Sequence, residues 1–207
     1  MSPIDESLTL RQQQAVARRK QILEKALHLF AKQGFDGTST RQIAQEAGIT
    51  EGLIFHYFPT KADLLTAVLD THHSFSGELR DFLTEAEALP TPTVLLSLAT
   101  NWLKTLRREE AITLVLFGVA QTNPQVGAAL QALIHEGVIR LAAYLTSRVQ
   151  AGELRGDLPV ESSALMFFSA LMIFFISHRT LSEPEWQQRS TSFVQEMISV
   201  WLDGARE

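Results

Sequence analysis

The chain of 207 residues contains no cysteine, and this absence excludes disulfide bonds, thiolate-bound metals and cysteine nucleophiles. It also lacks a glycine-rich phosphate loop and a serine-elbow motif. His72 and His73 are adjacent, so on a helix they point in different directions and cannot both bind one metal in the usual way. The sequence therefore predicts that the protein is not an enzyme and holds neither a metal nor a cofactor.

Long hydrophobic runs are scarce as well. The longest, Leu165–Ile176, is about a dozen residues, whereas a membrane-spanning helix needs about twenty. A helix that is apolar on all sides in a soluble protein must be covered on all sides, and a subunit interface does this. The N-terminal segment has acidic residues and no apolar run, so it does not resemble a signal peptide. We therefore expect an interface and no membrane insertion.

The charge is unevenly distributed along the chain. The net charge is −5, but residues 1–65 hold 8 Lys/Arg and 7 Asp/Glu, whereas residues 66–207 hold 10 and 16. This asymmetry lets the N-terminal part approach phosphate and directs the acidic part away from it. Arg18, Arg19 and Lys20 lie at a helix start, where cations oppose the macrodipole and favour another partner. A solvated charge run is the alternative interpretation of that cluster.

Helical periodicity dominates the sequence, and almost nothing alternates like a β-strand. Glycines and prolines mark the boundaries of nine predicted helices, three short ones followed by six longer ones. A fourth helix to about residue 86 would join the two groups. We predict an all-α protein with an N-terminal three-helix DNA-binding domain and a six-helix ligand-binding and dimerisation bundle. The expected boundaries are a flexible tail at 1–12, the first domain at 13–60 and the second at 61–207.

Residues 40–58 have the pattern of a helix, a tight turn and a second helix. Gly48 stands where the chain leaves the first helix in a left-handed conformation, and Ala44 is small where the helices cross. Thr50 can cap the second helix. This pattern is typical of the helix-turn-helix, whose second helix enters the DNA major groove, although an ordinary helical hairpin is the alternative.

The order of residues in this region resembles the DNA-binding domain of the tetracycline-repressor (TetR) family. The match covers roughly residues 18–66 and comprises Gly34-Phe35, Thr38-Ser39-Thr40, Ile43-Ala44, Glu46-Ala47-Gly48, Gly52, Phe55-His56-Tyr57-Phe58, Lys61 and Leu64-Leu65. The resemblance implies a cytoplasmic, dimeric bacterial transcriptional regulator whose C-terminal domain binds a small molecule that changes operator affinity. Repression of a palindromic operator in double-stranded DNA is the activity that it favours.

The resemblance also implies which residues touch DNA. By position, phosphate contacts fall to Thr38, Ser39 and Arg41, base-edge contacts to Thr50, Gly52 and Leu53, and backbone contacts to Phe55, His56, Tyr57 and Lys61.

Three positions depart from the family pattern, because Phe55 stands where tyrosine is usual and Glu51 and Leu53 replace lysine and a small hydroxyl residue. Glutamate can accept from cytosine N4 and leucine can contact a thymine methyl, which suggests those bases in each half-site. Alternatively, Glu51 only favours the positive end of its helix.

A dimer is expected because one recognition helix buries too little surface to specify a site, whereas two read half-sites about 34 Å apart. The predicted interface pairs the last two helices of each subunit in a four-helix bundle. Its residues are Leu165, Ser169, Met172, Ile176, Phe193, Met197, Val200 and Trp201. Intrachain core packing is the alternative for the same stripe.

Candidate effector contacts are polar or aromatic residues inside the apolar helices. They are Asn101, Trp102, Phe117, Gln121, Tyr144, Phe168 and His178. Core packing is the alternative for each one, but as a set they suggest a largely apolar small molecule. A ligand carrier or interaction protein without DNA binding is the rival function, and it would leave Arg41, Thr50 and Lys61 without a purpose.

Overall fold

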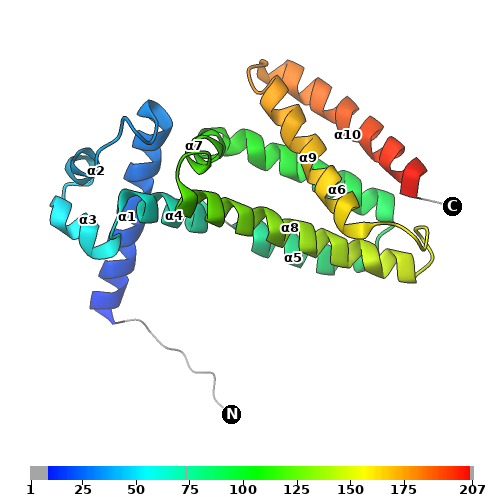
Figure 1. Ribbon diagram of the computed structural model, residues 1–207, viewed down its shortest axis with the longest axis horizontal. Helices are drawn as coiled ribbons and strands as arrows, with labels where there is room; N and C mark the ends of the chain where they lie inside the picture. The colour runs from blue at the N-terminus through cyan, green and yellow to red at the C-terminus, as the bar shows by residue number, and fades with distance from the viewer. Residues whose placement is uncertain (1–8, 73, 206–207) are drawn as a thin grey trace, which may run out of the picture. The chain divides into compact units, whose positions relative to one another are not determined.

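The computed structural model describes residues 9–72 and 74–205, and this part of the chain is helical, with no strand (Figure 1). The helices are α1 (Leu10–Gln33), α2 (Thr40–Glu46), α3 (Glu51–Tyr57), α4 (Lys61–His72), α5 (Ser74–Glu85), the 3-10 turn η1 (Ala86–Ala88), α6 (Thr91–Arg108), α7 (Glu110–Ala120), α8 (Pro124–Gln150), α9 (Val160–His178) and α10 (Glu183–Ala205). The predicted all-α class is confirmed. The single predicted fourth helix corresponds to two helices, α4 and α5. Between them stands residue 73, which is not among the described residues.

The first helix begins earlier than the sequence indicated. Thr9 caps it by accepting a hydrogen bond from the Gln12 backbone, while the Gln12 side chain accepts from the Thr9 backbone N–H at 2.8 Å. This reciprocal capping box satisfies two backbone donors, so residues 10–12, predicted as part of a tail, are helical. Residues 1–8 of that predicted tail lie outside the described part of the chain.

The chain divides into two compact units, and the first contains α1 to α4 together with residues 114–129. Within it α1 packs against α2 and α4, and α2 packs against α3. Ile22, Phe30, Ile43 and Ile54 are fully buried and supply one core. Leu64 of α4 is buried in the same unit, so the compact unit extends past the domain boundary predicted at residue 60.

The second unit comprises residues 73–113 and 130–207. Here α6 packs against both α9 and α10. Its core is aliphatic and aromatic, with Leu95, Phe167, Phe175 and Trp186 almost completely buried. Because α6 lies against the last two helices, side chains of α6, α9 and α10 contribute to the apolar interior of this unit.

Two helices, α8 and α9, are long and apolar enough to cross a membrane by length and composition alone. The core helix of a globular protein passes the same test. One face of α9 is buried in the second unit, including Phe167, Leu171 and Phe174, while Met166 and Ile173 on its other face are exposed. The exposed face of α9 is therefore an apolar surface in this single chain.

Candidate nucleic-acid interface

Residues 39–57 form the predicted helix-turn-helix. Gly48 has a φ of 63°, and the Ile49 N–H donates to the Ala44 carbonyl across the turn at 3.0 Å. Thr50 caps α3, since its hydroxyl accepts from the Leu53 N–H. Ile43, Ala44 and Ile54 are buried between the helices. The left-handed glycine and the threonine cap are both confirmed, and they fix the angle at which α3 leaves the turn.

The outward surface of α3 is small and apolar. Phe55 is 45% exposed, His56 is exposed, and Leu53 is half-buried. A Cβ added to Gly52 would meet nothing within 4 Å, so the backbone is open at that point. The ring of His56 packs edge-on against Tyr57, which is half-buried. This surface can approach a groove closely and can offer apolar contacts there.

The start of α2 provides one exposed cation and two hydroxyl groups that are already hydrogen-bonded within the protein. Arg41 is exposed. The Ser39 hydroxyl accepts from the Gln42 N–H and donates to the Gln42 side chain at 3.0 Å, so it serves as the cap of α2. Thr38, another predicted contact, is only 1% exposed and donates its hydroxyl hydrogen to the Gly34 carbonyl at 2.7 Å. Of the three predicted phosphate contacts, Ser39 and Arg41 are exposed and Thr38 is buried.

Glu51 takes part in a bond that the sequence did not suggest. Its Oε1 accepts a hydrogen bond from the Thr40 hydroxyl at 2.5 Å. The bond joins the first residue of α3 to the first residue of α2, so it ties the two helix starts together. One of the two carboxylate oxygens of Glu51 is therefore already hydrogen-bonded within the protein.

Lys61 also bonds within the protein. Its Nζ donates to the Phe35 carbonyl at 2.8 Å and to the Thr38 carbonyl at 3.0 Å, and it lies 4.2 Å from the centre of the Phe35 ring. The first residue of α4 therefore holds the loop between α1 and α2.

Arg18 and Arg19, two cations of α1, have partners in the same unit. The Arg19 guanidinium lies 5.2 Å from the Phe58 ring centre, and Arg18 donates to the Gln21 side chain at 2.9 Å. Gln21 in turn donates to the Ala47 carbonyl at 3.0 Å, which attaches α1 to the end of α2. Sequence reasoning missed Gln21 because a glutamine on a helix surface carries no pattern that reveals a partner 26 residues away.

The predicted effector residues belong to both compact units. Trp102 and Phe168 pack edge-on, with ring centres 5.8 Å apart in the second unit. Tyr144 is buried there, and burial raises the pKa of its hydroxyl. Asn101 is exposed. Phe117 and Gln121 belong to the first unit, where the Gln121 side chain donates to the Phe117 carbonyl at 3.3 Å.

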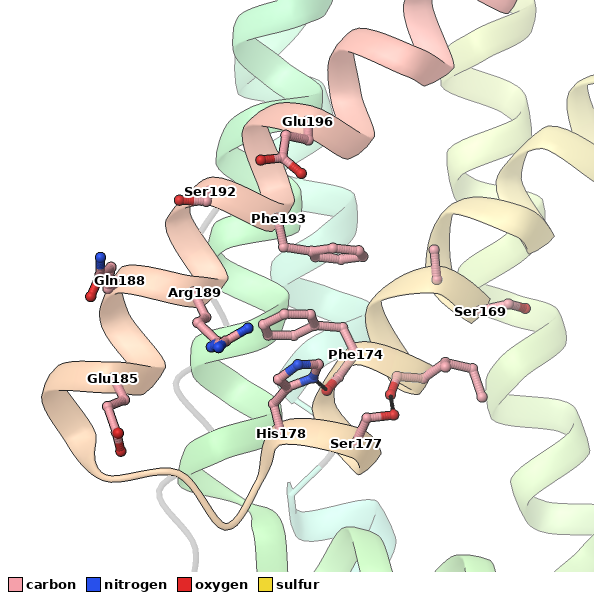
Figure 2. A pocket seen from close by; sticks show the side chains of 12 residues that line it. Ser169, Phe174, Ser177, His178, Glu185, Gln188, Arg189, Ser192, Phe193 and Glu196 are labelled. Carbon is pink, nitrogen blue, oxygen red and sulfur yellow. Dashed lines mark hydrogen bonds between the residues drawn. The ribbon is translucent and has the colours of Figure 1, made fainter.

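His178, the seventh predicted effector residue, lines a groove between α9 and α10 of about 920 Å³ (Figure 2). The rings of His178, Phe174 and Phe193 form a stack there, with neighbouring ring centres 4.4 Å apart. Ser169 and Phe193, which the sequence assigned to a dimer interface, line the same groove. The structure thus places His178 with the predicted interface residues.

The remaining predicted interface residues differ in exposure. Val200 is 74% exposed, Leu165 and Ile176 are exposed, and Met172, Met197 and Trp201 are half-buried.

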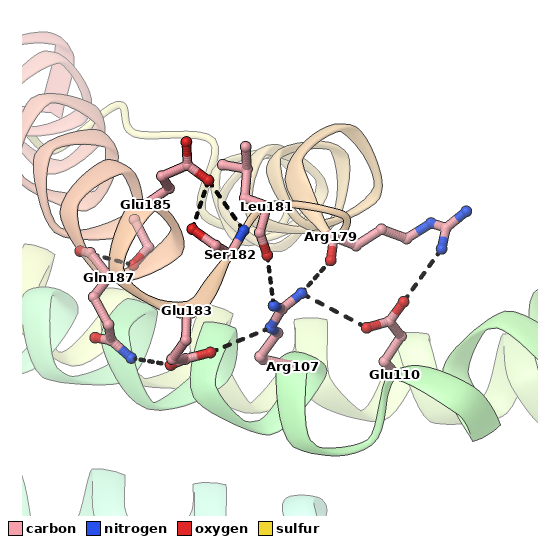
Figure 3. Close-up of polar contacts among 9 residues, drawn as sticks. Arg107, Glu110, Arg179, Leu181, Ser182, Glu183, Glu185 and Gln187 are labelled. Atoms are coloured by element: carbon pink, nitrogen blue, oxygen red, sulfur yellow. Dashed lines mark hydrogen bonds and ion pairs between the residues drawn. The ribbon is translucent and has the colours of Figure 1, made fainter.

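The turn between α9 and α10 is held by Arg107, which sequence reasoning also missed (Figure 3). Its guanidinium donates to the Arg179 carbonyl and, at 2.9 Å, to the Leu181 carbonyl. It also forms ion pairs with Glu110 and Glu183, both at 3.7 Å. These contacts attach the end of α6 to a turn that lies more than seventy residues away in the sequence.

Comparison with known proteins identifies a family to which this chain is similar. The profile of bacterial regulatory proteins of the tetR family matches residues 22–68. Over 166 residues the chain is 30% identical to the probable HTH-type transcriptional regulator ArpR of Pseudomonas putida, and the match covers 76% of this chain and 78% of ArpR. The HTH-type transcriptional regulator TtgR, also from Pseudomonas putida, matches with the same identity and coverage.

Solved structures give the same fold at low identity. FadR from Bacillus subtilis, solved in complex with stearoyl-CoA, has a TM-score of 0.74 and 18% identity, with 89% of this chain and 97% of FadR covered. Salmonella enterica GusR has a TM-score of 0.75 and 21% identity, with 90% of this chain and 94% of GusR covered. At these identities the likeness concerns the fold alone.

Proposed function

The chain belongs to the tetracycline-repressor (TetR) family of bacterial DNA-binding transcriptional regulators, and from this premise we propose that it is a cytoplasmic repressor that binds a palindromic operator as a dimer and is released by a small, largely apolar effector. The observation that carries the proposal is the exposed surface of α3 on a complete helix-turn-helix. The family acts by binding DNA, and the protein is not an enzyme.

The exposed surface of α3 favours apolar readout of the major groove. Leu53 has no hydrogen-bonding group in its side chain, so it discriminates bases by contact with a thymine methyl. Open space at Gly52 supports a close approach of the backbone. Arg41 and His56 are exposed beside this surface and can reach phosphates. We therefore expect thymine in each half-site opposite Leu53.

The dimer is proposed to form through the outer faces of α9 and α10. Met166, Ile173 and Val200 are 66%, 63% and 74% exposed in the single chain, a degree of exposure that a partner helix would remove. Two such helices from each protomer form a four-helix bundle. The two recognition helices of the dimer then read half-sites about 34 Å apart.

The effector is proposed to bind in the second unit, near the aromatic pair of Trp102 and Phe168. The helices α6 and α9 that carry this pair contribute to the apolar core of the second unit, which favours an apolar ligand. In its solved complex, FadR from B. subtilis, which shares this fold, holds stearoyl-CoA. The effector can release DNA only through a difference in its affinity for the DNA-bound and DNA-free conformations.

The proposal is tested by selecting duplexes from a random pool with the purified chain at moderate salt. We expect an inverted repeat with half-sites about 10 base pairs apart, centre to centre. The variant Leu53→Ser should lose the thymine preference at one position of each half-site and keep the rest of the motif. Ile139→Ser is the matched control, since Ile139 is 48% exposed on α8. Failure of the wild-type chain to enrich any inverted repeat would contradict the proposal and favour a ligand carrier.

A further inference from the structure

We propose that Lys61 is a positioning residue of the DNA interface, which holds the start of α2 in place and does not itself neutralise a phosphate. The proposal rests on the DNA-binding function proposed above. It concerns the side chain that the family resemblance assigns to a backbone contact.

The ammonium group of Lys61 bonds to the turn that precedes α2. A lysine ammonium has three donors, and two of those at Lys61 bond to the Phe35 and Thr38 carbonyls. The Thr38 N–H also donates to the Phe35 carbonyl at 3.2 Å, so residues 35–38 form a turn. The ammonium therefore binds the carbonyl oxygens at both ends of one turn, with the Phe35 ring beside it.

The turn at residues 35–38 supports the start of α2. Thr38 is buried and leads directly into Ser39, the cap of α2, and Arg41 follows on the exposed side. With only seven residues, α2 has little stability of its own, so its start depends on the contacts of the preceding turn. Lys61 supplies two of those contacts from the first residue of α4. Loss of Lys61 would loosen the segment that presents Arg41.

A positioning residue and a phosphate contact differ in how they affect the salt dependence of DNA binding. A side chain that neutralises one phosphate releases counterions, so its removal lowers the slope of log K against log salt concentration by about 0.9. A positioning residue neutralises no phosphate itself, so its removal leaves that slope unchanged as long as Arg41 still reaches its phosphate, and it alters the free protein instead.

The experiment compares Lys61→Met with Arg41→Met on the selected operator across a series of salt concentrations. We expect Lys61→Met to weaken operator binding roughly tenfold with an unchanged salt slope, because charge-assisted bonds inside the protein are lost. Arg41→Met is the matched control and should lower the slope by about 0.9. In the DNA-free protein, hydrogen exchange at the amides of residues 38–43 should accelerate in Lys61→Met and stay unchanged in Arg41→Met.

A second variant keeps the test decisive if Lys61→Met folds poorly. Lys61→Gln is equally uncharged but retains an amide donor for the turn carbonyls. Positioning predicts that it recovers part of the lost affinity, whereas phosphate contact predicts equal loss in both variants.

Two results would overturn the proposal. The first is a salt slope lowered by about 0.9 in Lys61→Met with normal hydrogen exchange, and the second is faster exchange with unchanged operator affinity. A wild-type chain that selects no operator would instead count against DNA binding as a whole, before any variant is made.

Discussion

Asp63 is the acidic side chain through which the stability of the first unit should depend on pH. Its Oδ2 accepts from the Thr60 hydroxyl at 2.7 Å and from the Thr60 N–H at 2.9 Å, and its Oδ1 accepts from the Gln125 side chain at 2.5 Å. The hydrogen bonds from Thr60, followed by that from Gln125, lower the pKa of Asp63 below its usual value of 3.8. The ionised form is therefore favoured in the folded state.

The sign of the pH effect follows from the lowered pKa. The stabilisation is fully present above the unfolded pKa and is lost as pH falls through the folded value. We expect Asp63→Asn to lower the free energy of unfolding by about 1 kcal/mol at pH 7 and by less near pH 3. Urea denaturation of both chains at the two pH values measures this. An equal difference at both pH values would contradict the assignment.

Gly52 offers a test that separates stability from DNA binding. A Cβ at Gly52 in α3, or at Gly118 in α7, meets nothing within 4 Å. Alanine at either helical position should stabilise the fold by about 0.5 kcal/mol, because it restricts the unfolded chain. Only Gly52→Ala adds a methyl to the surface proposed to face DNA, so it alone should weaken operator binding. Thermal melts of both variants measure the stability, and binding titrations measure the operator affinity. Equal operator affinities of the two variants would argue against contact at Gly52.

At the residue scale, local signals were predictable and distant ones were not. The left-handed turn at Gly48 and the cap at Thr50 depend on neighbours within about five residues, so the sequence predicted both. Glu51 was assigned to a base or to the helix dipole, and both assignments stay predictions, but the bond that its carboxylate accepts from Thr40, eleven residues away, was not foreseen. Such a bond depends on where a second helix lies, which no local pattern records.

At the scale of elements, Arg107 is the side chain that connects α6 to the α9–α10 turn. A planar guanidinium can serve two carbonyls and two carboxylates at once, whereas an ammonium cannot reach this set in one geometry. We expect Arg107→Lys to lower the free energy of unfolding by about 1–2 kcal/mol in urea denaturation.

Arg108 provides the matched control for this prediction. Its side chain is exposed and forms an ion pair with the neighbouring Glu109 at 2.9 Å. Arg108→Lys should change stability by less than about 0.5 kcal/mol. Equal losses in the two variants would mean that the turn does not depend on the guanidinium of Arg107.

Helix positions were predictable because apolar periodicity and proline both act locally. The orientation of α9 was less predictable, since that helix is apolar on nearly every side. The predicted stripe included Met172, which is half-buried, and omitted Met166 and Ile173, which are the most exposed large apolar residues of α9. Without polar residues to mark one face, the core contacts of Phe167, Leu171 and Phe174 decide which side faces inward.

At the scale of the whole molecule, the all-α class and the helix-turn-helix could be predicted, but the grouping of helices could not. Residues 114–129 form part of the first compact unit although they follow α6 of the second. The Gln125 bond to Asp63 joins residues 62 positions apart within that unit. This pairing follows from tertiary packing and has no counterpart in helical periodicity.

The proposed dimer interface predicts which exposed substitutions change the oligomeric state. Val200 is 74% exposed, so Val200→Glu should leave the protomer folded while it places a charge in the α9–α10 interface. Sedimentation should show a dimer for the wild-type chain and a monomer for this variant. Ile139→Glu, an exposed substitution on α8, should remain dimeric.

Inserting about 5 base pairs between the half-sites turns one of them to the opposite side of the duplex. A dimer held by α9 and α10 cannot then place both recognition helices, so wild-type affinity should fall to that of a single half-site. A monomeric Val200→Glu chain binds each half-site independently and should be indifferent to the insertion. Equal sensitivity in the two proteins would show that contacts other than the proposed α9–α10 interface couple the recognition helices.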